Sequence, residues 1–169
     1  MKILLIPQRL ELAQEQIDFN HGFGYLLSVI RQAGHEAELL DTDPVLFDRQ
    51  SVEKRIKETE CDIIGIGGLS PGFRSIEWLF KCVRSLRPEI PIILGGGVLT
   101  SAPLLMFNHL RPDYGVIGEG EQTIVDLLGC LRDGSTPLPV HGLMVNGSEP
   151  SPRKPIKDLD SLPYPAWND

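Results

Sequence analysis

The chain has 169 residues, 41% of them hydrophobic and 23% charged, which is the size and composition of one folded domain and argues against a disordered chain. Its 16 lysines and arginines stand against 23 aspartates and glutamates, so the net charge is −7. This acidic balance argues against nucleic acid and anionic membrane surfaces as partners, because both are held by clustered basic residues, and no apolar run is long enough to span a membrane.

Short apolar runs alternate with amphipathic segments along the chain. In order, the pattern predicts a strand over 2–7, a helix over 21–33, a strand over 36–41, a helix over 51–60, a strand over 62–69, a helix over 73–86, a strand over 90–94, a helix over 104–110, a strand over 114–117 and a helix over 121–132. Residues 142–145 are a candidate for a short sixth strand at the sheet edge.

The alternation of strand and helix predicts an α/β fold, with a doubly wound parallel sheet of five strands and helices on both faces. Right-handed crossovers leave two common strand orders, Rossmann-like and flavodoxin-like, and five units favour the flavodoxin-like order 2-1-3-4-5. In either order, ligands bind beyond the carboxyl ends of the strands. The loops after the strands are therefore the place to look for a site.

Glycines gather in three of these loops. The candidate site residues are Gln8 and Arg9 after the first strand, Gly67, Gly68, Leu69 and Ser70 after the third, Gly95, Gly96, Gly97 and Thr100 after the fourth, and Gly118, Glu119, Gly120 and Glu121 after the fifth. One such loop is explained by turn geometry alone, since glycine tolerates positive φ. Three of them at one sheet edge indicate a ligand with a long footprint that approaches the backbone closely.

Several common sites are excluded by their motifs. The first strand ends without the glycines of a dinucleotide fold, no phosphate-binding P-loop occurs, and no nucleophile–histidine arrangement is visible. The four histidines lack metal-ligand spacing, and His35 is predicted to be a surface or turn residue. Cys61, Cys82 and Cys130 are odd in number and far apart, so they are predicted to be small buried thiols, which fits a cytoplasmic protein. No catalytic or metal-ligating residue is assigned.

Six segments together resemble one known family. They are 22–27 (GFGYLL), 31–37 (RQAGHEA), 62–66 (DIIGI), 94–97 (LGGG) with Thr100 and Pro103, 113–121 (DYGVIGEGE) and 156–167 (IKDLDSLPYPAW). This set is similar to the N-terminal cobalamin-binding domain of class B radical SAM enzymes. The resemblance covers nearly the whole chain, and its most specific parts are the GEGE segment and the closing linker.

The resemblance implies a cobalamin-binding module over residues 1–147, with the nucleotide tail of cobalamin inserted at the carboxyl edge of the sheet. It implies a proline-rich linker over 148–169, toward a C-terminal radical SAM domain of the same polypeptide that binds a 4Fe-4S cluster and S-adenosylmethionine. No cysteine cluster for that iron–sulfur centre occurs in this chain. The family includes methyltransferases and the anaerobic magnesium-protoporphyrin ester cyclase type, so the module implies methyl transfer or ring-forming chemistry in the parent enzyme.

The chain departs from related patterns at named positions. The Asp-x-His-x-x-Gly motif of other cobalamin domains is missing after the first strand, which implies base-off cobalamin with no protein histidine on cobalt. Family members often carry Ser at position 67, Thr at 70 and His at 98, where this chain has Gly67, Ser70 and Val98. These differences favour an alternative, a docking or structural domain of a radical SAM protein that has lost cobalamin binding.

The roles expected for the site residues follow from the resemblance. Gly95, Gly96 and Gly97 would let the tail pass close to the backbone. Ser70 and Thr100 would offer hydroxyl groups to the tail, Glu119 and Glu121 would accept hydrogen bonds from ribose or corrin amides, and Arg9 would pair with the tail phosphate. An alternative for Glu121 is a structural one, since a carboxylate at a helix start complements the helix dipole. Trp167 is expected to be an interdomain anchor.

Overall fold

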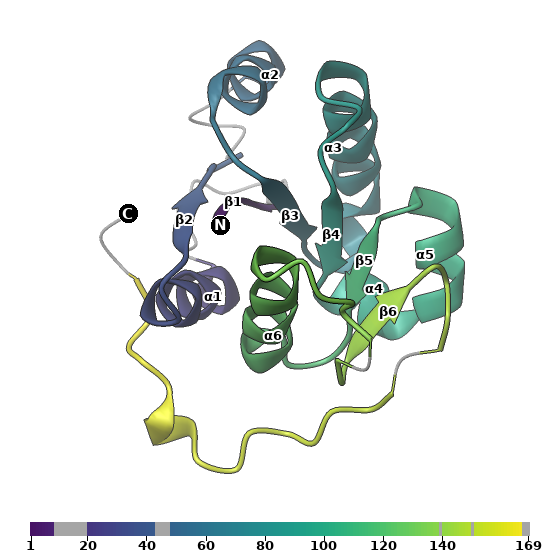
Figure 1. Ribbon diagram of the computed structural model, residues 1–169. Helices are drawn as coiled ribbons and strands as arrows, with labels where there is room; N and C mark the ends of the chain where they lie inside the picture. Colours follow the sequence, from purple (N-terminus) through teal and green to yellow (C-terminus); the bar gives the residue numbers. More distant parts are fainter. Residues whose placement is uncertain (9–19, 43–47, 139, 150, 167–169) are drawn as a thin grey trace.

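Six strands form one sheet in the order β2-β1-β3-β4-β5-β6 (Figure 1). The computed structural model describes residues 1–8, 20–42, 48–138, 140–149 and 151–166. The strands are β1 (Lys2–Pro7), β2 (Glu36–Leu39), β3 (Ile63–Gly67), β4 (Ile92–Gly95), β5 (Tyr114–Val116) and β6 (Leu143–Val145). β1 to β5 are parallel and β6 is antiparallel to β5. The predicted order 2-1-3-4-5 is confirmed, and the candidate sixth strand is present as β6.

Helices cover both faces of this sheet. They are α1 (His21–Gln32), α2 (Arg49–Glu58), α3 (Phe73–Leu86), α4 (Gly97–Ser101), α5 (Pro103–Leu110) and α6 (Glu121–Arg132), with short 3₁₀ turns η1 (Ser70–Gly72) and η2 (Leu159–Ser161). α1 and α6 lie on one face, and α2 and α3 on the other (Figure 1). Within the described ranges, no helix has the length and apolar character needed to cross a membrane.

The central strands are buried on both faces, which is why they read as continuous apolar runs rather than as alternating ones. Ile63 and Ile64 are neighbours in β3 and both are fully buried. Ile63 belongs to the core cluster under α1 and α6, and Ile64 to the cluster under α2 and α3. The sheet therefore separates two cores.

Side-chain caps fix where two of the helices begin. Asn20 accepts a hydrogen bond from the backbone amide of Phe23 at the start of α1. Asp48 accepts one from Ser51 at 2.7 Å, so α2 begins at Arg49, two residues before the predicted start. Asn and Asp are favoured at this position because their oxygens satisfy amides that have no partner within the helix.

The segment after β4 differs from the prediction. Residues 95–100 were expected to form a loop, whereas the chain turns into α4 at Gly97. Val98 and Leu99 explain this difference, because they are 1% and 0% exposed and their burial in the α2/α3 core holds the helical turn. α5 follows at once and begins with Pro103, a position where the missing amide proton costs nothing.

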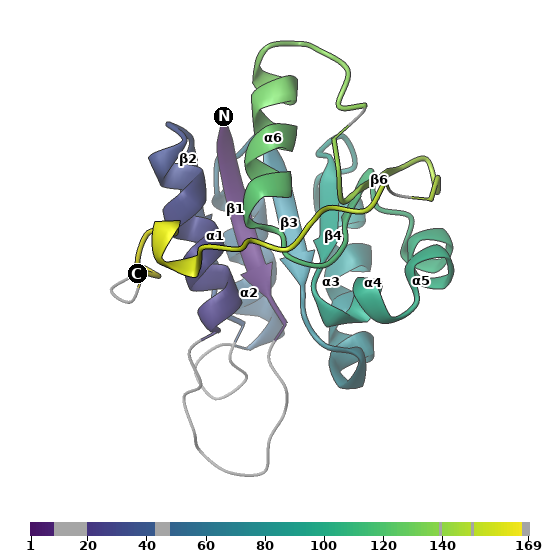
Figure 2. The ribbon, with the colours of Figure 1, turned by 90° about the horizontal axis from the view of Figure 1, so that it is seen from below.

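The last described segment, residues 151–166, is called here the strap. It runs extended from the β6 side across α6 to α1 (Figure 2). Arg153 pairs with Asp126 of α6, and the Ser28 hydroxyl of α1 donates to the Tyr164 carbonyl at 2.7 Å. Leu162 packs against the core under α1 and α6. The strap is therefore attached to the domain along its length.

Candidate functional site

The carboxyl ends of the parallel strands bring the predicted loops to one edge of the sheet. Three hydrogen bonds join them: Gln8 N–H donates to the Gly67 carbonyl at 2.8 Å, Val98 N–H to the Gly68 carbonyl at 3.0 Å, and Gly118 N–H to Thr100 Oγ1 at 3.1 Å. The four loops therefore lie together at the carboxyl edge of the sheet, as expected from the strand order. Arg9 lies outside the described residues.

The Gly96 position allows the loop after β4 to approach the loop after β3. Its φ is +81°, and a Cβ added there would lie 2.8 Å from the Gly68 carbonyl oxygen. Only glycine fits both conditions. In this structure the glycines at 96 and 68 are thus used for contact between the two loops, and the expected contact of Gly96 with a ligand tail stays a prediction.

A second set of glycines clears a strip of the sheet beneath α1. Gly65 and Gly67 of β3 face the α1/α6 side, and Gly67 is in register with Gly95 of β4. A Cβ at Gly67 would lie 3.1 Å from the Gly95 carbonyl oxygen and 3.3 Å from Cζ of Phe23. We call these three glycines the glycine floor. The buried ring of Phe23, on the first turn of α1, lies over it.

Gln8 has a structural position at the end of β1. It is 5% exposed, and its Oε1 accepts a hydrogen bond from the Leu69 amide at 3.4 Å. A Cβ added at Gly68 would lie 2.6 Å from that oxygen, and one at Gly72 would also collide with the Gln8 side chain. Gln8 therefore fills the space that these two glycines leave, while Leu69 beside it is 54% exposed at the edge.

The two hydroxyl groups predicted to contact the ligand tail, those of Ser70 and Thr100, make hydrogen bonds within the protein. Ser70 Oγ lies 3.1 Å from Ser101 Oγ, which links η1 to α4. Thr100 Oγ1 accepts the Gly118 amide and so links α4 to the loop before α6. Each hydroxyl still has a second hydrogen-bonding function, because a hydroxyl both donates and accepts.

The two glutamates of the GEGE segment differ. Glu119 Oε2 accepts the Ile156 amide of the strap at 2.7 Å. Glu121 begins α6, where its charge complements the helix dipole, and its Oε2 is buried without a hydrogen-bond partner among the described residues. A buried acceptor without a donor is costly, so this oxygen is suited to an N–H or O–H group brought by a ligand.

Three titratable groups with shifted pKa values, His35, Cys61 and Cys82, lie away from this edge. His35 was expected at the surface, but it is 6% exposed at the start of β2 and its Nδ1 is 3.4 Å from the N-terminal amine. Burial, then the N-terminal charge, lowers the pKa of His35. Burial raises the pKa of Cys82 to about 11 and that of Cys61 as well, so both thiols stay protonated and are poor nucleophiles.

In the described part of the chain, no group of three acidic, histidine or cysteine side chains is placed to hold a metal.

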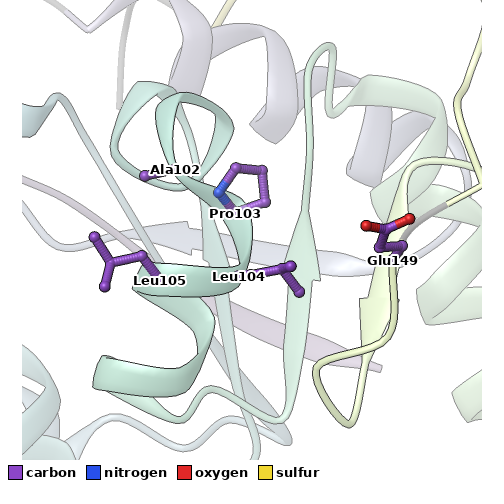
Figure 3. Close-up of a pocket in the computed structure, with 5 residues that line it drawn as sticks. All are labelled: Ala102, Pro103, Leu104, Leu105 and Glu149. Atoms are coloured by element: carbon purple, nitrogen blue, oxygen red, sulfur yellow. The ribbon is translucent and has the colours of Figure 1, made fainter.

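A hollow of about 430 Å³ lies elsewhere, at the start of α5 (Figure 3). Its lining includes Pro103, Leu104, Leu105 and Glu149. Leu104 and Leu105 are 44% and 65% exposed, so it is an open apolar depression. None of the sequence-predicted site residues is among its labelled lining residues.

Comparison of the sequence with known proteins identifies its family. Residues 17–128 match the family model described as the B12 binding domain, so the chain belongs to the B12-binding domain family. It is 28% identical to an uncharacterized methyltransferase, PH0819, of Pyrococcus horikoshii over 99% of this chain, and 24% identical to the anaerobic magnesium-protoporphyrin IX monomethyl ester cyclase of Rubrivivax gelatinosus over 85%. The chain spans only 38% and 27% of the lengths of these two relatives.

Solved structures share the fold. The radical S-adenosylmethionine methyltransferase TsrM of Kitasatospora setae, with tryptophan substrate and aza-SAM bound, superposes with a TM-score of 0.76 at 19% identity, covering 89% of this chain and 30% of TsrM. The cobalamin-dependent radical enzyme OxsB, with aqua-cobalamin bound, gives 0.78 at 19% identity, covering 98% of this chain and 24% of OxsB. The resemblance to the cobalamin-binding domain of cobalamin-dependent radical SAM enzymes is confirmed.

Sequence reasoning missed three residues that shape this edge. Phe23 lies within the predicted helix over 21–33, and only the absence of a side chain at Gly67 indicates its special place. Ser28 and Arg153 hold the strap, but a serine within a helix and an arginine among prolines give no such signal in the sequence. A periodic pattern identifies faces of helices and does not identify which distant segment crosses them.

Proposed function

We propose that this chain is a cobalamin-binding module that presents the corrin ring to a radical SAM catalytic domain on the same polypeptide. The observation that carries the proposal is the glycine floor of Gly65, Gly67 and Gly95 at the carboxyl edge of a doubly wound sheet, in a chain of the B12-binding family. Glycines at the end of central strands would let the nucleotide tail of cobalamin approach the backbone closely once the Phe23 ring moves from Gly67.

The residues present fit this cofactor. Cobalamin carries amide N–H groups and ribose hydroxyls around its rim, and the buried Glu121 Oε2 is an acceptor that has no protein donor among the described residues. Ser70 and Thr100 add hydroxyl groups at the same edge, and Leu69 offers an exposed apolar contact beside them. Gly68, Gly96 and Gly97 hold the supporting loops close together, while Gly118 leaves the backbone before α6 accessible and Gly120 makes room for Val116 and Leu26.

The state expected for the cofactor is base-off, with no protein imidazole on cobalt. His35 lies beside the N-terminal amine, His109 pairs with Glu77, and His141 contacts Ser151. His21 begins α1 near the carboxyl edge and is the one to test. A bound cobalamin would supply cobalt-centred methyl transfer or related radical chemistry. This chain contributes binding and orientation to that chemistry.

The proposed partner domain carries the 4Fe-4S cluster and S-adenosylmethionine. The named methyltransferase and cyclase relatives are both much longer than this chain, and so are TsrM and OxsB. Their length supports a fused arrangement, in which this module supplies the corrin and the partner supplies the catalytic residues. Cofactor sites at the junction of two domains are common.

The test is to mix the purified chain with hydroxocobalamin, remove free corrin on a desalting column and record the visible spectrum. We expect retained corrin with a base-off spectrum that does not change in His21→Ala. Cobinamide, which lacks the nucleotide tail, is the matched control and should be lost from the column. Retention of both corrins would argue against tail insertion at the glycine floor. Loss of hydroxocobalamin, from this chain and from a version carrying the following domain, would overturn the proposal.

A second candidate is a docking domain of a radical SAM protein that has lost cobalamin binding. The specific observation in its favour is that Val98, where the family often has histidine, is 1% exposed inside the α2/α3 core. Phe23 also covers Gly67 directly. The desalting experiment separates the two candidates, because the docking domain retains neither hydroxocobalamin nor cobinamide.

A further inference from the structure

The strap is attached to the loop of Glu119 and to the first turn of α1. At one end, the Ile156 amide donates to Glu119 Oε2 in the loop before α6 at 2.7 Å. At the other end, the Ala166 amide donates to the Gly24 carbonyl at 3.1 Å. Gly24 follows Phe23, whose ring lies over the glycine floor. The strap therefore ties the loop of Glu119 to the first turn of α1.

Two further contacts hold the strap, one before Ile156 and one between Ile156 and Ala166. Arg153 pairs with Asp126 on α6 and donates to the His141 carbonyl through Nε at 3.0 Å. The Ser28 hydroxyl of α1 donates to the Tyr164 carbonyl at 2.7 Å. Figure 2 shows the strap passing over both helices in turn. It bridges the two helices on the face of the sheet that carries the glycine floor.

The strap is held by polar contacts along its length and by apolar contacts near its end, where Leu162 and Ala166 pack against the α1/α6 core and Pro165 is buried. Leu159 and Tyr164 are open to solvent, at 65% and 92% exposed. Segments with few buried apolar contacts open at low free-energy cost. The prolines at 152, 155, 163 and 165 limit the conformations of the released strap, which lowers the entropy lost when it docks again. Such a segment is suited to docking and release.

We propose that the strap is a clamp on the proposed cobalamin site between the first turn of α1 and the loop before α6. Glu119 is the positioning residue that attaches the strap to that loop. This inference rests on the proposed function. Because the docked strap is attached to both α1 and the Glu119 loop, it holds these two parts of the site at a fixed spacing. Linkage then requires reciprocity: bound cobalamin stabilises the docked strap by the same factor by which the docked strap tightens cobalamin binding. Movement of a following domain that pulls on the strap would loosen the cofactor.

The first test needs no cofactor. Amide hydrogen exchange is followed by mass spectrometry for peptides covering 154–166 and 20–28 in the full chain. Glu119→Ala should speed exchange over the whole strap and in the first turn of α1. Glu119→Gln keeps an acceptor oxygen, so its exchange should be as slow as that of the unaltered chain. Faster exchange at 154–157 alone would mean that the strap contacts act independently, and that result overturns the clamp whether or not cobalamin binds.

The second test uses hydroxocobalamin and a residue outside the candidate site. Ser28→Ala removes one hydrogen bond to the strap and should weaken hydroxocobalamin binding roughly three- to tenfold. The matched control is Ser135→Ala. The Ser135 hydroxyl, just after α6, donates to the Cys130 carbonyl of α6 and not to the strap. Hydroxocobalamin should also slow exchange of the strap in the unaltered chain. Unchanged affinity in Ser28→Ala with a released strap would overturn the proposal, whereas no binding to the unaltered chain would count against the proposed function alone.

Discussion

The two faces of β3 carry different side chains toward the helices. Toward α2 and α3 the strand presents Ile64 and Ile66, which are 0% and 2% exposed. Toward α1 and α6 it presents Ile63 and then only Gly65 and Gly67. The same strand therefore fills a core with its own side chains on one face, whereas on the other its glycines leave space that Leu5 and Phe23 occupy.

This difference separates the requirements of stability from those of binding. Buried isoleucines contribute to the free energy of folding, whereas glycines within a strand lower it, because they bury no side chain and lose more backbone freedom on folding. Glycines concentrated at the carboxyl half of one face therefore mark the place where close approach matters more than stability. In the structure Phe23 makes that approach, and in the proposed function the nucleotide tail does.

The largest effect is expected on the filled face. Ile64→Ala should lower the free energy of unfolding by about 3 kcal/mol, because it leaves a cavity among fully buried side chains. Urea denaturation followed by circular dichroism measures this loss. Hydroxocobalamin affinity of the folded fraction should stay unchanged. A loss below about 1 kcal/mol would show that the α2/α3 core relaxes around the cavity, and would weaken the contrast between the faces.

Next comes Gly96, where the backbone itself is constrained. Gly96→Ala should cost about 2 kcal/mol of unfolding free energy, since φ is +81° and the new Cβ meets the Gly68 carbonyl. Gly129→Ala is the matched control in α6, because nothing lies within 4 Å of its Cβ position and alanine favours the helix. It should stabilise the chain by about 0.5–1 kcal/mol. Equal effects from both substitutions would contradict the close contact between the two loops.

On the glycine floor the effect should fall on binding more than on folding. Gly67→Ala places a methyl group 3.1 Å from the Gly95 carbonyl and 3.3 Å from Phe23, which should cost about 1 kcal/mol of stability. The same methyl group occupies the floor, so the dissociation constant for hydroxocobalamin should rise about tenfold or more. Titration followed by visible absorbance measures it, with Gly129→Ala as the control. Unchanged affinity would place the tail elsewhere.

Much of this comparison was accessible from the sequence. The order of the strands followed from alternating apolar runs, because right-handed crossovers leave few alternatives. The loops of the candidate site followed from it, since the ends of parallel strands meet at one edge. Glycines at 67, 95 and 96 were identified, but sequence alone does not distinguish a glycine required by a neighbouring loop, such as Gly96, from one that clears a face of the sheet, such as Gly67.

Contacts between distant segments were not accessible in the same way. The helical turn at Val98 depends on a core that forms only when β4 is in place, so local pattern predicted a loop there. Glu119 was expected to face a ligand, whereas its carboxylate accepts the Ile156 amide from a segment 37 residues away. His35 was expected to be a surface or turn residue because it opens the second predicted strand, yet the N-terminal amine lies beside it.

The smallest expected effect comes from His35, at the amino end of the face that carries the glycine floor. Burial first, then the N-terminal ammonium group and Arg132, lowers the pKa of His35 from its ordinary value of 6.5. The unfolded chain therefore takes up the proton before the folded chain does as pH falls. The free energy of unfolding should be fully retained above about pH 7.5, decline through pH 6.5 and level off only below the lowered pKa.

His35→Gln tests this, because glutamine keeps a polar side chain but does not titrate. Urea unfolding between about pH 7.5 and pH 5.5 should give a shallower decline in unfolding free energy for His35→Gln than for the unaltered chain. His141→Gln is the control for replacing a histidine at an exposed position, because His141 is exposed beside Ser151. An identical slope in His35→Gln would mean that His35 is reached by water in the folded chain. The amino end of this face would then be less tightly closed than the isoleucine-filled face of β3.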